Sequence, residues 1–261
     1  MTATGAYVSF AKSDGAFPLA AGGHAAPIVV SGSDYTGVRR TVGDLADDVN
    51  RVTGIEPKVT TSDAIPTDSD RIVIVGTLGH SPLIDRLASQ HKIDSATIKG
   101  KWETSIEQVV DNPVPGVKQA LVIAGGDQRG SIYGAYDVSR GIGVSPWYWW
   151  DDVKPTHRDS LYIDAGTHTQ GTPAVKYRGF FINDENPSLG RAAKNLFGEG
   201  KAPGYPGGFN HLLYAKVFEA GLRLKANYIW PAVWGRTFDQ DDPENQQTAT
   251  DYGIVMGTSH E

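Results

Sequence analysis

Along the first part of the chain, short apolar runs alternate with segments in which apolar residues recur at helical spacing. Residues 27–30, 71–75 and 119–124 are nearly all apolar, which is typical of strands buried on both faces. The segment after the first run ends at Gly54, a residue type favoured just beyond a helix C-terminus. Its apolar positions are Val38, Val42, Leu45, Val49 and Val52. This alternation predicts an α/β domain rich in βαβ units.

The small, polar residues 165–174 are predicted to form a linker or domain boundary. The alternation then restarts. Strands are predicted at residues 175–182, 226–233 and 253–256, with helices at 209–222 and 243–251. Near-continuous apolar strands joined by helices favour a parallel sheet.

The length limits how this pattern can be divided into domains. At roughly 150 residues per domain, 261 residues allow two modest domains or one large barrel. A (β/α)8 barrel needs about 200 residues, and far fewer follow the boundary. We therefore expect an α/β domain with its boundary linker at residues 1–170. Residues 171–261 are expected to hold the first three of eight βα units, so that the chain is a truncated form of a longer protein.

Composition and charge exclude several classes of protein. The 24 basic residues are outnumbered by 30 acidic ones and form no cluster, which argues against nucleic-acid binding. No apolar run approaches the roughly 18 residues of a membrane span, and the first residues lack a signal-peptide pattern. Without cysteine the chain has no disulfide, thiolate metal ligand or cysteine nucleophile.

Polar residues follow the first and third predicted strands of the second half. Asn183-Asp184-Glu185 follows the first, and adjacent carboxylates there can bind sugar hydroxyls, position water or act as a general base. A solvated loop or a helix cap is the alternative. Ser259-His260-Glu261 follows the third and offers acid/base or hydrogen-bonding groups, with a structural histidine as the alternative. It is no zinc signature, because the chain has no His-Glu-x-x-His.

Tryptophans border the end of the second predicted strand. Trp230 and Trp234 bracket Pro231-Ala232-Val233, and their faces suit stacking on pyranose rings, with core packing as an equal alternative. Trp147, Trp149 and Trp150 are instead expected to pack the first domain onto its neighbour.

Three other motifs favour a structural reading. Gly76-Thr77-Leu78-Gly79 and residues 125–130 are similar to phosphate loops but lack their signatures, so tight turns are expected. Asp239-Gln240-Asp241-Asp242 lacks the glycine and terminal glutamate of an EF-hand, so a solvated loop is expected.

Five segments together resemble a known family. They are Gly126-Asp127-Gln128-Arg129-Gly130-Ser131-Ile132-Tyr133-Gly134, Gly143-Val144-Ser145-Pro146-Trp147-Tyr148-Trp149-Trp150, Tyr177-Arg178-Gly179-Phe180-Phe181-Ile182-Asn183-Asp184-Glu185, Asn227-Tyr228-Ile229-Trp230-Pro231-Ala232 and Gly257-Thr258-Ser259-His260-Glu261. The first two resemble the N-terminal domain of glycoside hydrolase family 115, the xylan α-1,2-glucuronidases. The others are similar to that family's first three barrel strands.

The resemblance implies an accessory α/β domain at residues 1–170 and the N-terminal portion of a TIM (β/α)8 barrel at residues 171–261. It implies an inverting, exo-acting hydrolase that removes glucuronic or 4-O-methylglucuronic acid from xylan side chains. The partner is then glucuronoxylan or a xylo-oligosaccharide, with no metal or other cofactor. A homodimeric full-length protein with an extracellular or periplasmic location is also implied.

By position, the resemblance carries over five residues that would line the pocket, namely Asp184, Glu185, Trp230, His260 and Glu261. Glu185, Asp184 and His260 are expected to be catalytic, with a water-positioning role for Glu185 and substrate contact for His260. Asn183, Trp230, Trp234 and Glu261 are expected to bind the substrate. The general acid is expected on a later strand, so this chain alone is expected to be inactive. The alternatives are another glycosidase of similar layout, such as a hexosaminidase-like enzyme, and a non-catalytic carbohydrate-binding module.

Overall fold

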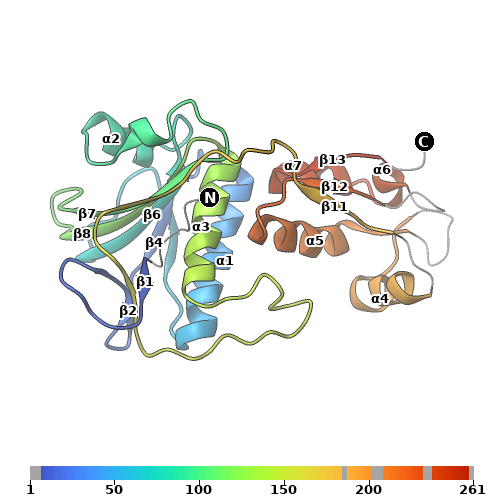
Figure 1. Ribbon diagram of the computed structural model, residues 1–261, viewed down its shortest axis with the longest axis horizontal. Helices are drawn as coiled ribbons and strands as arrows, with labels where there is room; N and C mark the ends of the chain where they lie inside the picture. Colours follow the sequence, from blue (N-terminus) through green and yellow to red (C-terminus); the bar gives the residue numbers. More distant parts are fainter. Residues whose placement is uncertain (1–6, 184–186, 202–207, 232–236, 259–261) are drawn as a thin grey trace. The chain divides into compact units, whose positions relative to one another are not determined.

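The computed structural model describes residues 7–183, 187–201, 208–231 and 237–258. It divides into two compact units, Met1–Ala174 and Val175–Glu261 (Figure 1). Both units are of mixed α/β type, and together they hold several sheets. None of the helices described is long and apolar enough to cross a membrane.

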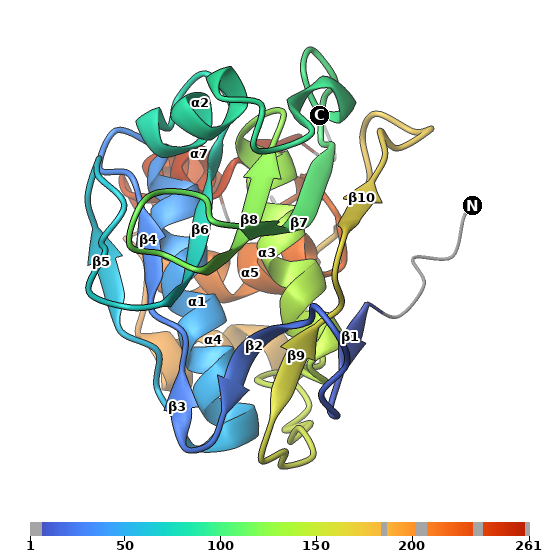
Figure 2. The same cartoon turned by 90° about the vertical axis from the view of Figure 1, so that its left-hand side faces the viewer.

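The first unit is built on a six-stranded sheet with the order β10-β7-β8-β6-β4-β5 (Figure 2). Strands β4 (Ile28–Val30), β5 (Val59–Thr61), β6 (Arg71–Thr77) and β8 (Gln119–Gly125) are parallel to one another. In contrast, β7 (Ser105–Asp111) pairs antiparallel with β8, and β10 (Thr167–Gln170) pairs antiparallel with β7. The expected linker at 165–174 is thus partly an edge strand, because β10 pairs with β7 along its whole length.

Helices cover both faces of this sheet, which explains the continuous apolar strands. On one face, Ile72 and Ile74 of β6 share a buried core with Leu83 of α2 (Pro82–Ser89). On the other, Ile123 of β8 closely approaches Gly134 of α3 (Gln128–Gly141), beside which lies α1 (Thr36–Thr53). A short 3-10 helix, η1 (Ser95–Thr97), precedes β7. Alternate residues of the central strands β6 and β8 therefore face different helices, and both sets are apolar.

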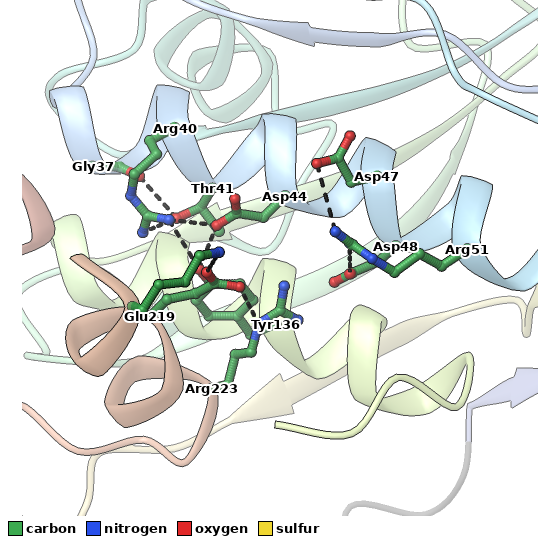
Figure 3. A network of polar contacts seen from close by, with 11 residues as sticks. Gly37, Arg40, Thr41, Asp44, Asp47, Asp48, Arg51, Tyr136, Glu219 and Arg223 are labelled. Atoms are coloured by element: carbon green, nitrogen blue, oxygen red, sulfur yellow. Dashed lines mark hydrogen bonds and ion pairs between the residues drawn. The ribbon is translucent and has the colours of Figure 1, made fainter. Parts of the chain in front are cut away.

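A polar contact connects α1 with α3 within the first unit (Figure 3). The Tyr136 hydroxyl of α3 donates to Asp44 Oδ2 of α1 at 2.5 Å and accepts from Arg40 Nη1 at 3.1 Å. Arg40 also forms an ion pair with Asp44 one turn along α1. Hydrogen bonds between charged and neutral partners are stronger than neutral ones, so this triad fixes how the two helices lie against each other.

A second sheet of the first unit has the order β1-β9-β2-β3 and pairs antiparallel throughout. Its strands are β1 (Val8–Ser9), β2 (Phe17–Ala21), β3 (His24–Ala25) and β9 (Leu161–Ile163). The sequence patterns did not predict this sheet, because each of its strands is too short to show a periodicity.

The second unit holds a parallel sheet with the order β11-β12-β13, as the sequence predicts. Its strands are β11 (Gly179–Phe181), β12 (Tyr228–Trp230) and β13 (Val255–Met256), each shorter than predicted. Helices α4 (Ser188–Phe197) and α5 (His211–Arg223) follow β11, whereas α6 (Phe238–Asp241) and α7 (Asn245–Tyr252) follow β12. Gly221 of α5 lies close to Phe180 and Ile229, so α5 covers the sheet face that bears these two side chains.

Candidate active site

The parallel strands of the second unit end at one edge of their sheet. Phe181 pairs with Trp230, and Ile229 pairs with Met256, so the residues that follow each strand emerge at this edge. Of the expected site residues the structure describes Asn183, which is exposed, and Trp230. The others lie outside the described residues; they are Asp184, Glu185, Trp234, His260 and Glu261.

Trp230 lies at the end of β12 with its ring partly open to solvent. The side chain is 46% exposed, so it does not have the core role that the sequence left open. Its Nε1–H donates to the Tyr228 hydroxyl at 2.8 Å, and the two rings meet edge to face. Its carbonyl accepts from the Ile182 amide at 2.9 Å. Strand pairing and a side-chain hydrogen bond therefore both orient this indole.

An aromatic hollow of about 670 Å³ lies against the sheet beside Trp230. The residues that line it are Tyr177, Gly179, Phe180, Phe181, Tyr228 and Trp230. Tyr177 and Tyr228 meet edge to face with ring centroids 5.9 Å apart. Aromatic walls with a hydroxyl group at their edge suit a ligand that has both apolar and polar faces, as a sugar ring does.

Gly257, just after β13, makes room for the pair formed by Tyr228 and Trp230. A Cβ atom added at Gly257 would collide with the Tyr228 hydroxyl and with the Trp230 indole. The need for glycine here arises from the neighbouring strand, so no local signal in the sequence could have revealed it.

A second hollow of about 480 Å³ lies between the ends of β12 and β13 and helices α6 and α7. Its wall combines Pro231, Phe238 and Met256 with the polar side chains of Asp239 and Thr258. The edge of the sheet is therefore hollowed where the strand-end residues emerge.

Buried acids anchor the loops at this edge, contrary to the solvated loop expected for residues 239–242. Asp241 is fully buried; its Oδ2 accepts from the Phe209 amide at 3.1 Å and its Oδ1 from the Thr237 amide at 2.9 Å. Asn245 donates to the carbonyls of Phe209 at 2.9 Å and Phe238 at 2.7 Å. These bonds join the start of α5 to the segment after β12, which explains the burial of Asp241.

Asp242 makes a second anchor with His211 at the start of α5. Its Oδ2 accepts from the His211 amide at 3.1 Å and lies 2.7 Å from His211 Nδ1, and its Oδ1 accepts from the Glu244 amide at 2.9 Å. Burial acts to raise the pKa of the Asp242 carboxyl, but the hydrogen bonds from Glu244 and His211 hold that pKa below its ordinary value.

Within the described ranges, His211, Asp242 and Glu244 could together offer three ligand atoms to a metal ion. Atoms of His211, Asp242 and Glu244 lie within 4.8 Å of one another. His211 and Asp242 already satisfy each other by hydrogen bonding. We therefore assign the side chains of His211 and Asp242 to anchoring the loop.

The two glycine-rich segments of the first unit form tight turns, as expected. Asp127 caps α3 through a bond from the Gly130 amide at 2.8 Å, and it also accepts from the Glu103 amide at 2.9 Å. Asp34 accepts from the Thr77 amide at 2.7 Å, and burial raises the pKa of this carboxyl. Carboxylates thus occupy the amides that a phosphate group would use.

Comparisons with known proteins agree with this architecture. No curated protein sequence matches the chain. The model of glycosyl hydrolase family 115 matches residues 170–261. The chain is similar to the solved structure of BtGH115A, a family GH115 4-O-methyl-α-glucuronidase with specificity for decorated arabinogalactans, with 32% identity and a TM-score of 0.76. That match covers 94% of this chain and 30% of BtGH115A.

A likeness to the chitobiase of Flavobacterium johnsoniae concerns the fold alone. Its identity is 12% and its TM-score 0.52, over 96% of this chain and 33% of that one. The match to BtGH115A extends across both units, and the family model covers the whole second unit together with the end of the first. The chain therefore belongs to glycosyl hydrolase family 115.

Proposed function

We propose that this chain is part of an α-glucuronidase that removes glucuronic or 4-O-methylglucuronic acid from polysaccharide side chains. The observation that carries the proposal is the similarity to BtGH115A, at 32% identity over 94% of the chain. The chain spans 30% of the length of BtGH115A, so the activity is proposed for the whole protein.

The proposal includes an architecture. Residues 1–170 are an accessory α/β domain, and residues 171–261 contain the first βα units of a TIM barrel. The parallel order β11-β12-β13 and the helices between these strands support this assignment. Barrel enzymes bind substrate at the carboxyl ends of their strands, which is the edge that bears Asn183 and Trp230.

The proposed mechanism is direct displacement with inversion. Such enzymes use a general acid and a general base roughly 6.5–9.5 Å apart, with water between the base and the anomeric carbon. Glu185 is proposed to position this water, Asp184 to assist it, and His260 to contact the sugar. Substrate-binding roles are proposed for Asn183, Trp230, Trp234 and Glu261. The exposed face of Trp230 supports a stacking role.

The substrate is proposed to be glucuronoxylan or a xylo-oligosaccharide, from which the terminal uronic acid of a side chain is removed without a metal or other cofactor. The specificity of BtGH115A favours a second candidate, a decorated arabinogalactan. An extracellular or periplasmic homodimer is proposed for the whole protein.

The test is product analysis with protein expressed from the complete reading frame that contains residues 1–261. Separate reactions would contain glucuronoxylan, a decorated arabinogalactan and an aryl N-acetylhexosaminide. Release of 4-O-methylglucuronic acid from either polysaccharide supports the proposal, and the preferred polysaccharide identifies the substrate. Release of N-acetylhexosamine alone would favour the hexosaminidase-like alternative, and binding without release would favour a carbohydrate-binding module.

A further inference from the structure

The first unit carries a hollow of about 370 Å³, whose wall contains none of the strand-end residues of the second unit. It lies at the amino ends of two parallel strands, because its wall includes Pro27, which precedes β4, and Arg71, which opens β6. Other parts of the wall come from the loop before β2 and from the β2–β3 hairpin. All of these residues precede the segment matched by the family model.

Basic side chains without hydrogen-bond partners line this hollow. Among the residues that the structure describes, the side chains of Lys12, His24 and Arg71 form neither a hydrogen bond nor an ion pair, and all three are exposed. Such groups are available to an incoming ligand at no cost in broken contacts.

The acidic residue in the wall, Asp70, already forms an ion pair with Lys118. Lys118 Nζ lies 2.6 Å from Asp70 Oδ2. The hydrogen bond and charge of Lys118 hold the pKa of the Asp70 carboxyl below its ordinary value, and the charge of Arg71 adds to this effect. The hollow therefore keeps a net positive charge on a chain whose formal net charge is −6.

An aromatic ring and prolines form the apolar part of the wall. Tyr162 of β9 pairs with Pro18 of β2 in the small sheet, and Pro27 lies in the same wall. The Tyr162 ring is half-buried, and within the described residues its hydroxyl has no hydrogen-bond partner. A ring face beside a free hydroxyl suits a pyranose, and the volume falls within the roughly 300–1,000 Å³ of small-molecule sites.

The backbone holds these groups in place. Gly22 and Gly23, with φ values of 60° and 79°, form the two-residue turn that presents His24. The Ser69 hydroxyl accepts from the Arg71 amide at 3.3 Å and donates to the Arg71 carbonyl at 2.7 Å, which fixes the start of β6. The backbone positions of His24 and Arg71 are thus set by strand pairing and turn geometry.

We propose that this hollow binds a sugar carboxylate of the uronic acid type. Arg71 and Lys12 hold the carboxylate, because a guanidinium can bind it through two parallel hydrogen bonds and an ammonium adds charge. Tyr162 contacts the sugar ring. The choice of a uronate rests on the proposed function, since an enzyme acting on glucuronate-decorated polysaccharides gains from a second point of attachment to them.

The test is calorimetric titration of residues 1–261 with glucuronic acid, 4-O-methylglucuronic acid, glucose and inorganic phosphate. Both uronic acids are expected to bind, and glucose and phosphate to bind at least about tenfold more weakly. Arg71→Gln should weaken uronate binding about tenfold and Lys12→Gln severalfold. Lys99→Gln makes the same change of charge at an exposed residue outside the hollow and should leave uronate binding unchanged.

Three results would overturn the site. They are an absence of uronate binding, equal binding of phosphate, and binding that persists in Arg71→Gln but is lost in Trp230→Ala. This experiment does not measure catalysis. If uronate binding depends on Arg71 but the complete protein releases no uronic acid, the site stands and the proposed function fails. If the complete protein releases uronic acid but Arg71→Gln binds uronate as tightly as the wild type, the proposed function stands and the site fails.

Discussion

Trp230 donates its indole N–H to the hydroxyl of Tyr228, two residues earlier on β12, across 2.8 Å. The bond satisfies the polar edge of the indole within the protein, while 46% of the side chain remains exposed. Tyr228 is thus the support that orients the proposed stacking surface.

Tyr228→Phe removes the acceptor of this hydrogen bond and keeps the ring. The free energy of unfolding should fall by about 1 kcal/mol, the net value of one such bond. In the complete enzyme KM should rise severalfold with little change in kcat, because the loss affects substrate orientation. Urea denaturation and steady-state kinetics measure the two effects.

The matched control is Tyr177→Phe. The ring of Tyr177 lines the same hollow, but its hydroxyl has no hydrogen bond within the described residues. It should be close to the wild type in both measurements. Equal behaviour of the two variants would contradict the supporting role of Tyr228.

Gly257→Ala should destabilise the second unit. The new methyl group would meet the Tyr228 hydroxyl and the Trp230 indole, and overpacking of this kind costs about 1–3 kcal/mol. Thermal unfolding followed by tryptophan fluorescence would detect the loss. Gly43→Ala in α1 is the control, since nothing lies within 4 Å of its added Cβ; it should be neutral or stabilising. A Gly257→Ala variant as stable as the wild type would disprove the close packing.

Asp242→Asn should change stability in a pH-dependent way. The pKa of this carboxyl is lower in the folded state than its ordinary value, because the hydrogen bonds from Glu244 and His211 outweigh partial burial. Its stabilising contribution is therefore fully present above the unfolded pKa of about 4 and is lost as pH falls through the folded pKa.

The variant should lose about 1–2 kcal/mol of unfolding free energy at pH 6, and the deficit should shrink at pH values below about 3. Urea titrations at several pH values would measure it. Asp239→Asn, an exposed acid in the same segment, should show no such deficit. A deficit of constant size across this pH range would refute the role of the Asp242 charge.

Much of the fold follows from local patterns in the sequence. The helix α1 and the strand β6 were predicted because apolar spacing and a terminal glycine are local signals. Strand β7 mixes apolar and polar residues without regular alternation, and it pairs antiparallel with β8, a direction that depends on how the chain returns to the sheet. The small sheet pairs β1 with β9, which are separated by most of the first unit.

The candidate site was predictable only in part. Strand direction alone places Asn183 and Trp230 at one sheet edge, so their position at this edge could be predicted from the sequence. Asp241 and Asp242 looked solvated because their partners, Phe209 and His211, lie more than thirty residues earlier in the chain. Burial through such distant contacts produces no periodic pattern of apolar residues in the sequence.

The stereochemistry of the reaction should be inversion. If one displacement by water occurs, the first product formed from an α-linked glucuronic acid is its β-anomer. Proton NMR of the anomeric signals in the first minutes of the reaction would show this product before mutarotation. Initial release of the α-anomer would indicate a covalent intermediate and would exclude the proposed role of Glu185 as a base for a single displacement.

The most direct test of the proposed active site compares wild type and Glu185→Gln in the protein expressed from the complete reading frame. The substrate is a 4-O-methylglucuronosyl xylo-oligosaccharide. Loss of a carboxylate that positions water should lower kcat by about 10²–10⁴-fold with little change in KM. Glu199→Gln, which removes an acid paired with Lys194, serves as control and should retain the wild-type kcat. A Glu185→Gln variant with the same kcat as the wild type would contradict the proposed site.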